Sequence, residues 1–187
     1  DFVTAAATDS YTRLIFPSIE REIRSSLTEK ASDSAIKVFS TNLKQLLMQP
    51  PVKDKVTLGL DPGYRTGCKV AVVDGTGKVL DTGVIYPAPP KSDIANSKII
   101  VKGFIEKYNV DVIAIGNGTA SHETEVFAAE VIKEIDREVS YMVVSEAGAR
   151  VYSASKLAAE EFHEYAVSLR SAVSIARRLQ DPLAELI

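Results

Sequence analysis

The chain of 187 residues is poor in the side chains that bind soft metals or form covalent cross-links. It has one cysteine, Cys68, two histidines and no tryptophan. A single cysteine excludes an internal disulfide and any cysteine-based zinc site, and two histidines are too few for a histidine-rich metal centre. We therefore expect Cys68 to be a thiol of the hydrophobic core.

The chain also lacks long apolar runs and an excess of basic charge. No run approaches the roughly 20 apolar residues of a membrane span, and no signal-peptide pattern opens the chain. We therefore expect a cytoplasmic protein with no membrane partner. The formal net charge is −3 and the pI is 5.5, whereas nucleic-acid-binding domains usually carry a basic footprint. A nucleic-acid partner would be bound weakly, through a local patch, or with help from other domains.

Residues 1–55 predict a helical region that ends in a proline-rich linker. Pro17 suits the first turn of a helix, and no glycine or proline interrupts 18–49. A continuous helix there would be roughly 50 Å long. The chain opens on Asp-Phe-Val and stops within a helical pattern, so we expect a fragment of a longer protein. The apolar side of the long helix would then pack on parts outside this sequence.

The middle of the chain alternates predicted strands with predicted helices. The expected strands are 56–61, 68–74, 79–86, 110–116 and 139–144, and the expected helices are 94–108, one from Ser121 onward, 150–162 and 168–180. Three antiparallel strands followed by helix–strand units are typical of the ribonuclease H-like α/β fold with a mixed five-stranded sheet. We divide the chain into a helical region over 1–55, an α/β domain over 56–165, and a final helix over 166–187.

Asp61 is the clearest candidate for chemistry, because it ends the first predicted strand and a glycine turn follows it. In ribonuclease H-like nucleases an acid here binds two catalytic divalent metals, which need several oxygen ligands. Glu146, after the fifth strand, is the second well-placed acid. Mg²⁺ or Mn²⁺ would therefore be held by Asp61 and Glu146. Two plainer interpretations stay open: Asp61 as a turn residue that accepts backbone N–H bonds, and Glu146 as a solvated loop acid.

An active nuclease of this type usually has three or four acids, and the sequence offers no clear third. The fourth strand ends without one, and the inward positions of the last helix are Arg170, Ser171 and Ser174. Glu123 or Glu125, in the first turn of the helix from Ser121, would have to supply it. This shortage predicts a degenerate nuclease site.

The loop 116–121 is a second candidate site, because it follows a strand and opens a helix. Backbone N–H groups at such a place favour anions. With Arg65 in the turn beside Asp61, this loop supplies Asn117, Thr119 and Ser121 as candidate nucleic-acid contacts. An ordinary strand-to-helix loop capped by Ser121 is equally compatible, and Arg65 either touches phosphate or pairs with Glu146.

Five segments together resemble one known family: 46–51, 58–67, 115–121, 144–149 and 177–183. They are similar to the YqgF-type ribonuclease H-like domain of the bacterial Tex transcription accessory proteins. The resemblance implies a helical N-terminal region, this domain, helix-hairpin-helix elements and an S1 domain, with nucleic-acid contact mainly in the parts absent here. The chain departs from the family pattern at four positions. A small residue is usual at Arg150, and Arg, Pro and Asp are common where this chain has His122, His163 and Ala166.

We therefore expect a nucleic-acid-associated module of a transcription accessory protein that requires no cofactor. Its partners would be RNA or DNA and the transcription machinery. One alternative is an active Mg²⁺- or Mn²⁺-dependent nuclease that uses Asp61 and Glu146. A second is an actin- or sugar-kinase-like ATP-binding domain, whose phosphate loop also places an acid before glycines. That class needs two such domains, and the sequence contains one Asp-Pro-Gly turn.

Overall fold

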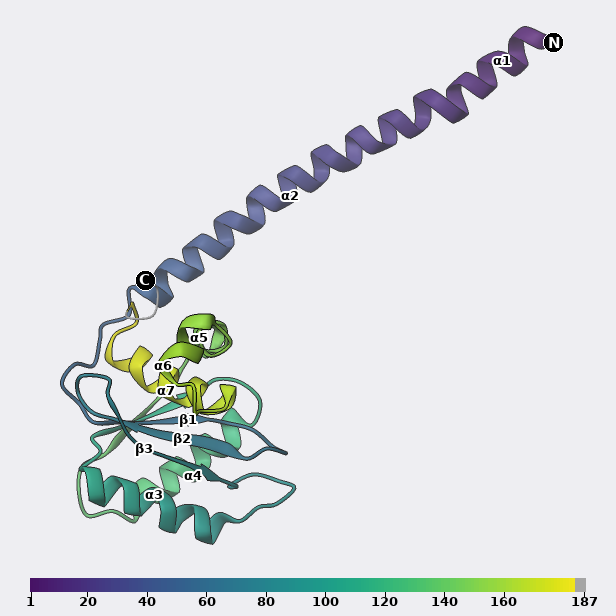
Figure 1. Ribbon diagram of the computed structural model, residues 1–187. Helices are drawn as coiled ribbons and strands as arrows, with labels where there is room; N and C mark the ends of the chain where they lie inside the picture. The colour runs from purple at the N-terminus through teal and green to yellow at the C-terminus, as the bar shows by residue number, and fades with distance from the viewer. Residues whose placement is uncertain (184–187) are drawn as a thin grey trace. The chain divides into compact units, whose positions relative to one another are not determined.

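The computed structural model describes residues 1–183, and the chain divides into a unit over residues 1–48 and a second unit that begins at Gln49. The first unit contains α1 (Phe2–Ser10), a π-helical turn η1 (Tyr11–Ile15) and α2 (Phe16–Leu47), which continue one another as a single rod (Figure 1). Pro17 lies in the first turn of α2, as predicted. The 32 residues of α2 span about 48 Å. None of them is buried.

The second unit is built on a five-stranded sheet. Its strands are β1 (Thr57–Asp61), β2 (Cys68–Val73), β3 (Val79–Ile85), β4 (Val112–Gly116) and β5 (Ser140–Val144). Their order across the sheet is β3-β2-β1-β4-β5. The pairs β1–β2 and β2–β3 are antiparallel, whereas β1–β4 and β4–β5 are parallel. The predicted mixed sheet is confirmed, and β4 is buried along its whole length, as its unbroken apolar run indicates.

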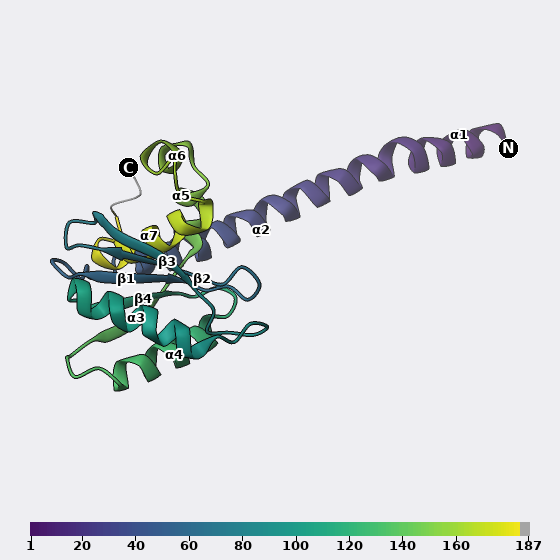
Figure 2. The same cartoon turned by 60° about the horizontal axis from the view of Figure 1, so that its bottom comes forward.

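Helices cover both faces of this sheet (Figure 2). One face carries α3 (Ile94–Tyr108) and α4 (Ser121–Lys133), and the other carries α5 (Ala147–Ser153), α6 (Lys156–Glu161) and α7 (Val167–Gln180). Leu58 and Leu60 of β1 pack in the core beneath α3 and α4, together with Cys68, which is buried as expected. Across residues 1–183, no helix combines the length and the apolar character that crossing a bilayer requires.

The close contact between α7 and β1 sets the position of the candidate site. Gly59 lies directly beneath α7, and a Cβ atom there would overlap the carbonyl oxygen of Ala172 and crowd the side chain of Ala176. Because side chains alternate along a strand, Asp61 lies on the same face as Gly59. The end of β1 therefore faces the first half of α7, where the buried side chains are small.

Two helix boundaries differ from the predictions. The helix expected over 150–162 begins earlier and divides into α5 and α6, because the Ser155 hydroxyl accepts the backbone N–H of Ala158 and caps a new helix. Ser121 was expected to cap α4. Instead Ala120 is the N-cap, in a left-handed conformation with φ of 64°, and Ser121 is the first helical residue. The end of the final helical region predicted over 166–187 lies outside the described residues.

Candidate functional site: two strand-end carboxylates

Asp61 is half-buried at the end of β1 and faces α7. The hydroxyl of Ser171, on α7, donates a hydrogen bond to its carboxylate. Loss of hydration, followed by the nearby charge of Glu146, raises the pKa of Asp61 to about 6. The Ser171 bond and the positive charges of Arg150 and Lys69 offset part of that shift. Asp61 is therefore a carboxyl group that can hold a proton close to neutral pH.

Glu146 lies just after β5 and is almost completely buried, with 5% of its surface exposed. Its carboxylate rests against the loop after β4. A Cβ atom at Gly118 would overlap that carboxylate, and one at Gly116 would approach its Oε2 atom to 2.8 Å. The two glycines thus provide the space in which the Glu146 side chain lies, which gives the loop after β4 a structural role.

Arg150 forms an ion pair with Glu146 one helical turn away on α5. The guanidinium side chain is 66% exposed, whereas the carboxylate side chain is only 6% exposed. The carboxamide oxygen of Asn117 also accepts the backbone N–H of Glu146 at 3.1 Å. Glu146 is thus fixed by a cation at its carboxylate and by Asn117 at its backbone.

Arg65, Thr119 and Ser121 form no hydrogen bond or ion pair with either carboxylate in the part of the chain that the structure describes. Arg65 and Thr119 are exposed in the loops around the site. The backbone N–H of Ser121 donates to the carbonyl of Gly118 at 3.2 Å. Arg150 therefore fills the ion-pair position beside Glu146 that Arg65 was considered for.

The two acids considered as a third metal ligand are each bound to a tyrosine. The Tyr64 hydroxyl donates to Glu123 at 2.8 Å, and the Tyr141 hydroxyl donates to Glu125 at 3.1 Å. Within residues 1–183 no group of three or more His, Cys, Asp or Glu side chains is arranged to hold a metal ion. Asp61 and Glu146 are brought together without a third acid.

A two-metal centre does not fit these residues. Two divalent ions need several anionic oxygen ligands around them. Here one of the two carboxylates is already neutralised by Arg150, and the inward position on α7 beside Asp61 carries the neutral hydroxyl of Ser171. The site therefore consists of the Glu146–Arg150 ion pair and one acid, Asp61, that can take up a proton.

Lys69 supports the turn between β1 and β2. It pairs with Asp61 in the strand register, and its ammonium group donates to the carbonyls of Thr66 and Gly67, the latter at 3.1 Å. Burial lowers the pKa of this lysine. Sequence reasoning missed Lys69, although its place opposite Asp61 follows from antiparallel pairing. It also missed the Glu146–Arg150 pair, which has the i,i+4 spacing of helical ion pairs.

The comparisons with known proteins agree with this fold. The family model described as "Tex protein YqgF-like domain" matches residues 55–180. The chain belongs to the Tex family. It is 59% identical to "Uncharacterized protein YdcI" of Bacillus subtilis over 96% of this chain and 25% of that protein. It is 52% identical to "Transcriptional accessory protein Tex" of Neisseria gonorrhoeae over 92% of this chain and 22% of that protein.

A more distant relative of this Tex domain occurs in humans. "S1 RNA-binding domain-containing protein 1" of Homo sapiens is 43% identical over 96% of this chain and 18% of that protein. The chain spans a quarter or less of the length of these relatives. Among solved structures, Thermus thermophilus RuvC superposes with a TM-score of 0.50 at 17% identity, covering 70% of this chain and 96% of RuvC. This similarity shows a shared ribonuclease H-like fold.

Proposed function

We propose that this chain is a metal-free, catalytically inactive ribonuclease H-like module of a Tex-type transcription accessory protein. It acts as a structural domain within a protein whose role involves nucleic acids. The observation that carries the proposal is the ion pair of Glu146 with Arg150, at the place where a nuclease would hold a metal ion.

The Glu146–Arg150 pair opposes metal binding for an electrostatic reason. Glu146 is buried, so its negative charge needs a partner, and Arg150 supplies one from within the domain. A divalent ion would have to displace a guanidinium group that is linked to the carboxylate through one turn of α5. Displacement would lose a charge-assisted hydrogen bond and would bring two cations close together.

The neutral hydroxyl of Ser171 opposes metal binding for a second reason. It stabilises the charge of Asp61 through a hydrogen bond, but it adds no negative charge with which to attract a divalent ion. The pocket therefore lacks the concentration of negative charge on which two-metal catalysis depends.

A nucleic-acid-associated role is supported by the printed names of the relatives, two of which refer to transcription or to an RNA-binding domain. The net charge of −3 argues that this part alone contributes little to phosphate binding. We expect the isolated chain to bind single-stranded RNA and DNA weakly in a fluorescence anisotropy titration. Tight, metal-dependent binding would favour the active nuclease instead.

The decisive test rebuilds the site. The double variant Arg150→Ser, Ser171→Asp frees Glu146 and adds a third carboxylate, and its matched control Arg150→Ser, Ser171→Asn adds an amide of the same shape. Mn²⁺ binding is measured by electron paramagnetic resonance, and cleavage of single-stranded and branched DNA and RNA is measured in the same samples. We expect the Asp variant to gain Mn²⁺ binding while the parent chain and the Asn control show neither binding nor cleavage. Mn²⁺-dependent cleavage by the parent chain would overturn the proposal.

A further inference from the structure

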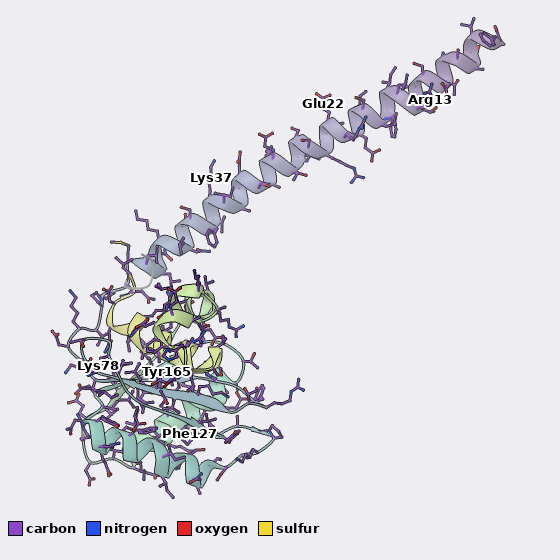
Figure 3. All side chains as sticks on the ribbon, viewed as in Figure 1. Arg13, Glu22, Lys37, Lys78, Phe127 and Tyr165 are labelled. Atoms are coloured by element: carbon purple, nitrogen blue, oxygen red, sulfur yellow. The ribbon has the colours of Figure 1, made fainter. Side chains whose placement is uncertain are left out.

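The two edges of the five-stranded sheet are protected to different degrees. β3 forms one edge and β5 forms the other. β3 begins directly after Lys78, labelled in Figure 3, and contains Asp81, whose carboxylate accepts a hydrogen bond from the Tyr108 hydroxyl at 2.7 Å. The register of β2 and β3 also shifts between Val72 and Val73. Charged side chains and bulges are the usual means by which an edge strand avoids pairing with another chain.

β5 carries none of these features along its five residues. Its sequence over 140–144, Ser-Tyr-Met-Val-Val, contains no charged residue, proline or glycine, and its register with β4 is regular. Tyr141, Met142 and Val143 are 39%, 50% and 41% exposed. An apolar edge strand without protection is a template on which a further strand can pair.

The backbone of β5 faces β4 and the free edge in alternation. The Ser140 N–H donates to the carbonyl just before β4, and the Val144 carbonyl accepts the N–H just after β4. Because alternate residues of a strand face the same neighbour, Met142 also faces β4, whereas Tyr141 and Val143 face the free edge. The backbone N–H and C=O groups of Tyr141 and Val143 form no hydrogen bond within residues 1–183.

We propose that β5 pairs with β5 of a second copy of this chain, antiparallel, about a two-fold axis at Met142. In this register Tyr141 of each copy lies opposite Val143 of the other, and Ser140 lies opposite Val144. The whole strand is then paired. Each outward N–H of Tyr141 and Val143 meets an outward C=O of the other copy, so that the free backbone groups of both strands are satisfied. The two sheets become one continuous sheet.

The side chains of β5 match one another in this arrangement. Tyr141 opposite Val143 is an aromatic–β-branched pair, a favourable cross-strand combination, and the two-fold axis repeats it. Met142 meets its own copy at a position where antiparallel strands approach most closely. On that face Met142 borders a hollow of about 190 Å³, lined also by Leu179 and Pro182, which leaves room for Met142 of the second copy. The edge is therefore complementary to itself, as a two-fold interface requires.

Other arrangements fit β5 less well. The strand offers no cationic side chain to a phosphate backbone. A parallel pair with two-fold symmetry would place each outward N–H opposite the same N–H of the other copy, so the hydrogen bonds could not form. One short strand buries less area than a stable complex usually needs, which predicts a weak dimer with a dissociation constant on the order of 100 µM.

Disulfide cross-linking tests the register. Met142→Cys places its thiol at the two-fold axis, where the Cα atoms of the two copies should lie about 4.5 Å apart, within the range of a disulfide. Ser140→Cys, on the same face of the same strand, is the matched control, because its Cα atoms would lie about 14 Å apart. Each variant of the 187-residue chain is oxidised, and covalent dimer is measured on non-reducing gels. Cys68 is buried, and the unsubstituted chain measures its background.

Sedimentation equilibrium tests the dimer itself, at protein concentrations from about 10 µM to 1 mM. Val143→Pro removes an outward N–H and leaves the bonds to β4 in place. Val143→Lys puts a charge on the edge and leaves the backbone unchanged. Val143→Thr keeps the N–H and the branched shape and is the control. Circular dichroism checks that each variant is folded.

We expect the parent chain and Val143→Thr to dimerise reversibly, and Val143→Pro and Val143→Lys to raise the dissociation constant at least about tenfold. Met142→Cys should cross-link at least about tenfold faster than Ser140→Cys. Equal cross-linking rates would overturn the register. A parent chain that stays monomeric throughout would overturn the pairing, and so would a dimer that neither Val143→Pro nor Val143→Lys weakens, because the contact would then lie elsewhere. None of these outcomes depends on whether the domain binds metal.

Discussion

Asp61 and Glu146 are two acids at the same edge of one sheet, yet the protein treats their charges differently. Glu146 is the more buried of the two, and Arg150 and Asn117 hold it in place. Asp61 is only half-buried but has no ion-pair partner within the described residues, and burial together with Glu146 raises its pKa. The charge of Glu146 is thus stabilised by its partners, whereas the charge of Asp61 costs free energy in the folded state.

On the proposed function, this difference makes the nuclease-like edge of the sheet a structural one. Arg150 converts Glu146 from an available ligand into half of an ion pair, and the Ser171 hydroxyl leaves Asp61 without a second nearby anion on α7. On the proposal that the domain is catalytically inactive, the fold would persist without the chemistry.

Removing Arg150 should have the largest effect, because it would leave Glu146 as unpaired as Asp61. We expect Arg150→Ala to lower the free energy of unfolding by about 2 kcal/mol, less than for a fully buried pair because Arg150 is largely exposed. Urea denaturation at pH 7 measures the change. Adding Glu146→Gln to this variant should recover most of the loss, and an unchanged stability in Arg150→Ala would show that Glu146 does not need the pair.

Removing the charge of Asp61 should have the next largest effect on the free energy of unfolding, and it should raise stability where removing Arg150 lowers it. Because its pKa in the folded protein is about 6, above the ordinary 3.8, the folded state binds the proton more tightly. The stability contributed by the protonated acid is present below about pH 4 and is lost as the pH rises through 6. We expect Asp61→Asn to stabilise the domain by about 1–2 kcal/mol at pH 7.

The pH dependence provides the control for that variant. The advantage of Asp61→Asn over the parent should disappear in urea denaturation at pH 3.5–4, where the acid is already protonated. A constant advantage at both pH values would attribute the effect to packing or hydrogen bonding. A loss of stability at pH 7 would show that the Asp61 charge is favourable in the folded state.

Loosening the loop beneath Glu146 should have a smaller effect. Asn117→Ala removes the acceptor for the Glu146 backbone N–H, and we expect a loss of about 1 kcal/mol in thermal denaturation. Thr119→Ala, in the same loop and also exposed, serves as the control and should be neutral. Equal effects of the two substitutions would indicate a general response of the loop.

The smallest expected change in the free energy of unfolding comes from the turn that follows Asp61. Tyr64→Phe removes the exposed hydrogen bond to Glu123 and should change the free energy of unfolding by less than about 0.5 kcal/mol. Tyr141→Phe, which removes the corresponding bond to Glu125, is its matched control. A loss above 1.5 kcal/mol in Tyr64→Phe alone would show that the turn needs this contact.

Periodicity and element order were sufficient to predict the sheet, the long helix α2 and the inward positions of α7. Ser171 and Ser174 are both buried, as their helical spacing indicates. The Glu146–Arg150 pair was not predicted, because the helix was expected to begin at Arg150, whereas α5 begins at Ala147. A helix predicted to begin at Ala147 would have placed Glu146 and Arg150 one turn apart, and their i,i+4 spacing would have identified the pair.

The role of the loop 116–121 also depended on tertiary structure. Its backbone N–H groups were expected to favour an anion, but the space at its glycines holds the Glu146 side chain, which comes from a part of the chain distant in sequence. No local propensity distinguishes a glycine that admits a ligand from one that admits a neighbouring side chain. The left-handed conformation of Ala120 was likewise not visible in the sequence.

A Mn²⁺ titration of the unmodified chain at pH 7.5, followed by electron paramagnetic resonance beside Asp61→Asn, tests the central claim most directly. The account predicts no saturable binding up to millimolar Mn²⁺ and the same spectrum for both proteins. Stoichiometric binding of one or two Mn²⁺ ions by the parent, lost in Asp61→Asn, would contradict it and make Asp61 a metal ligand.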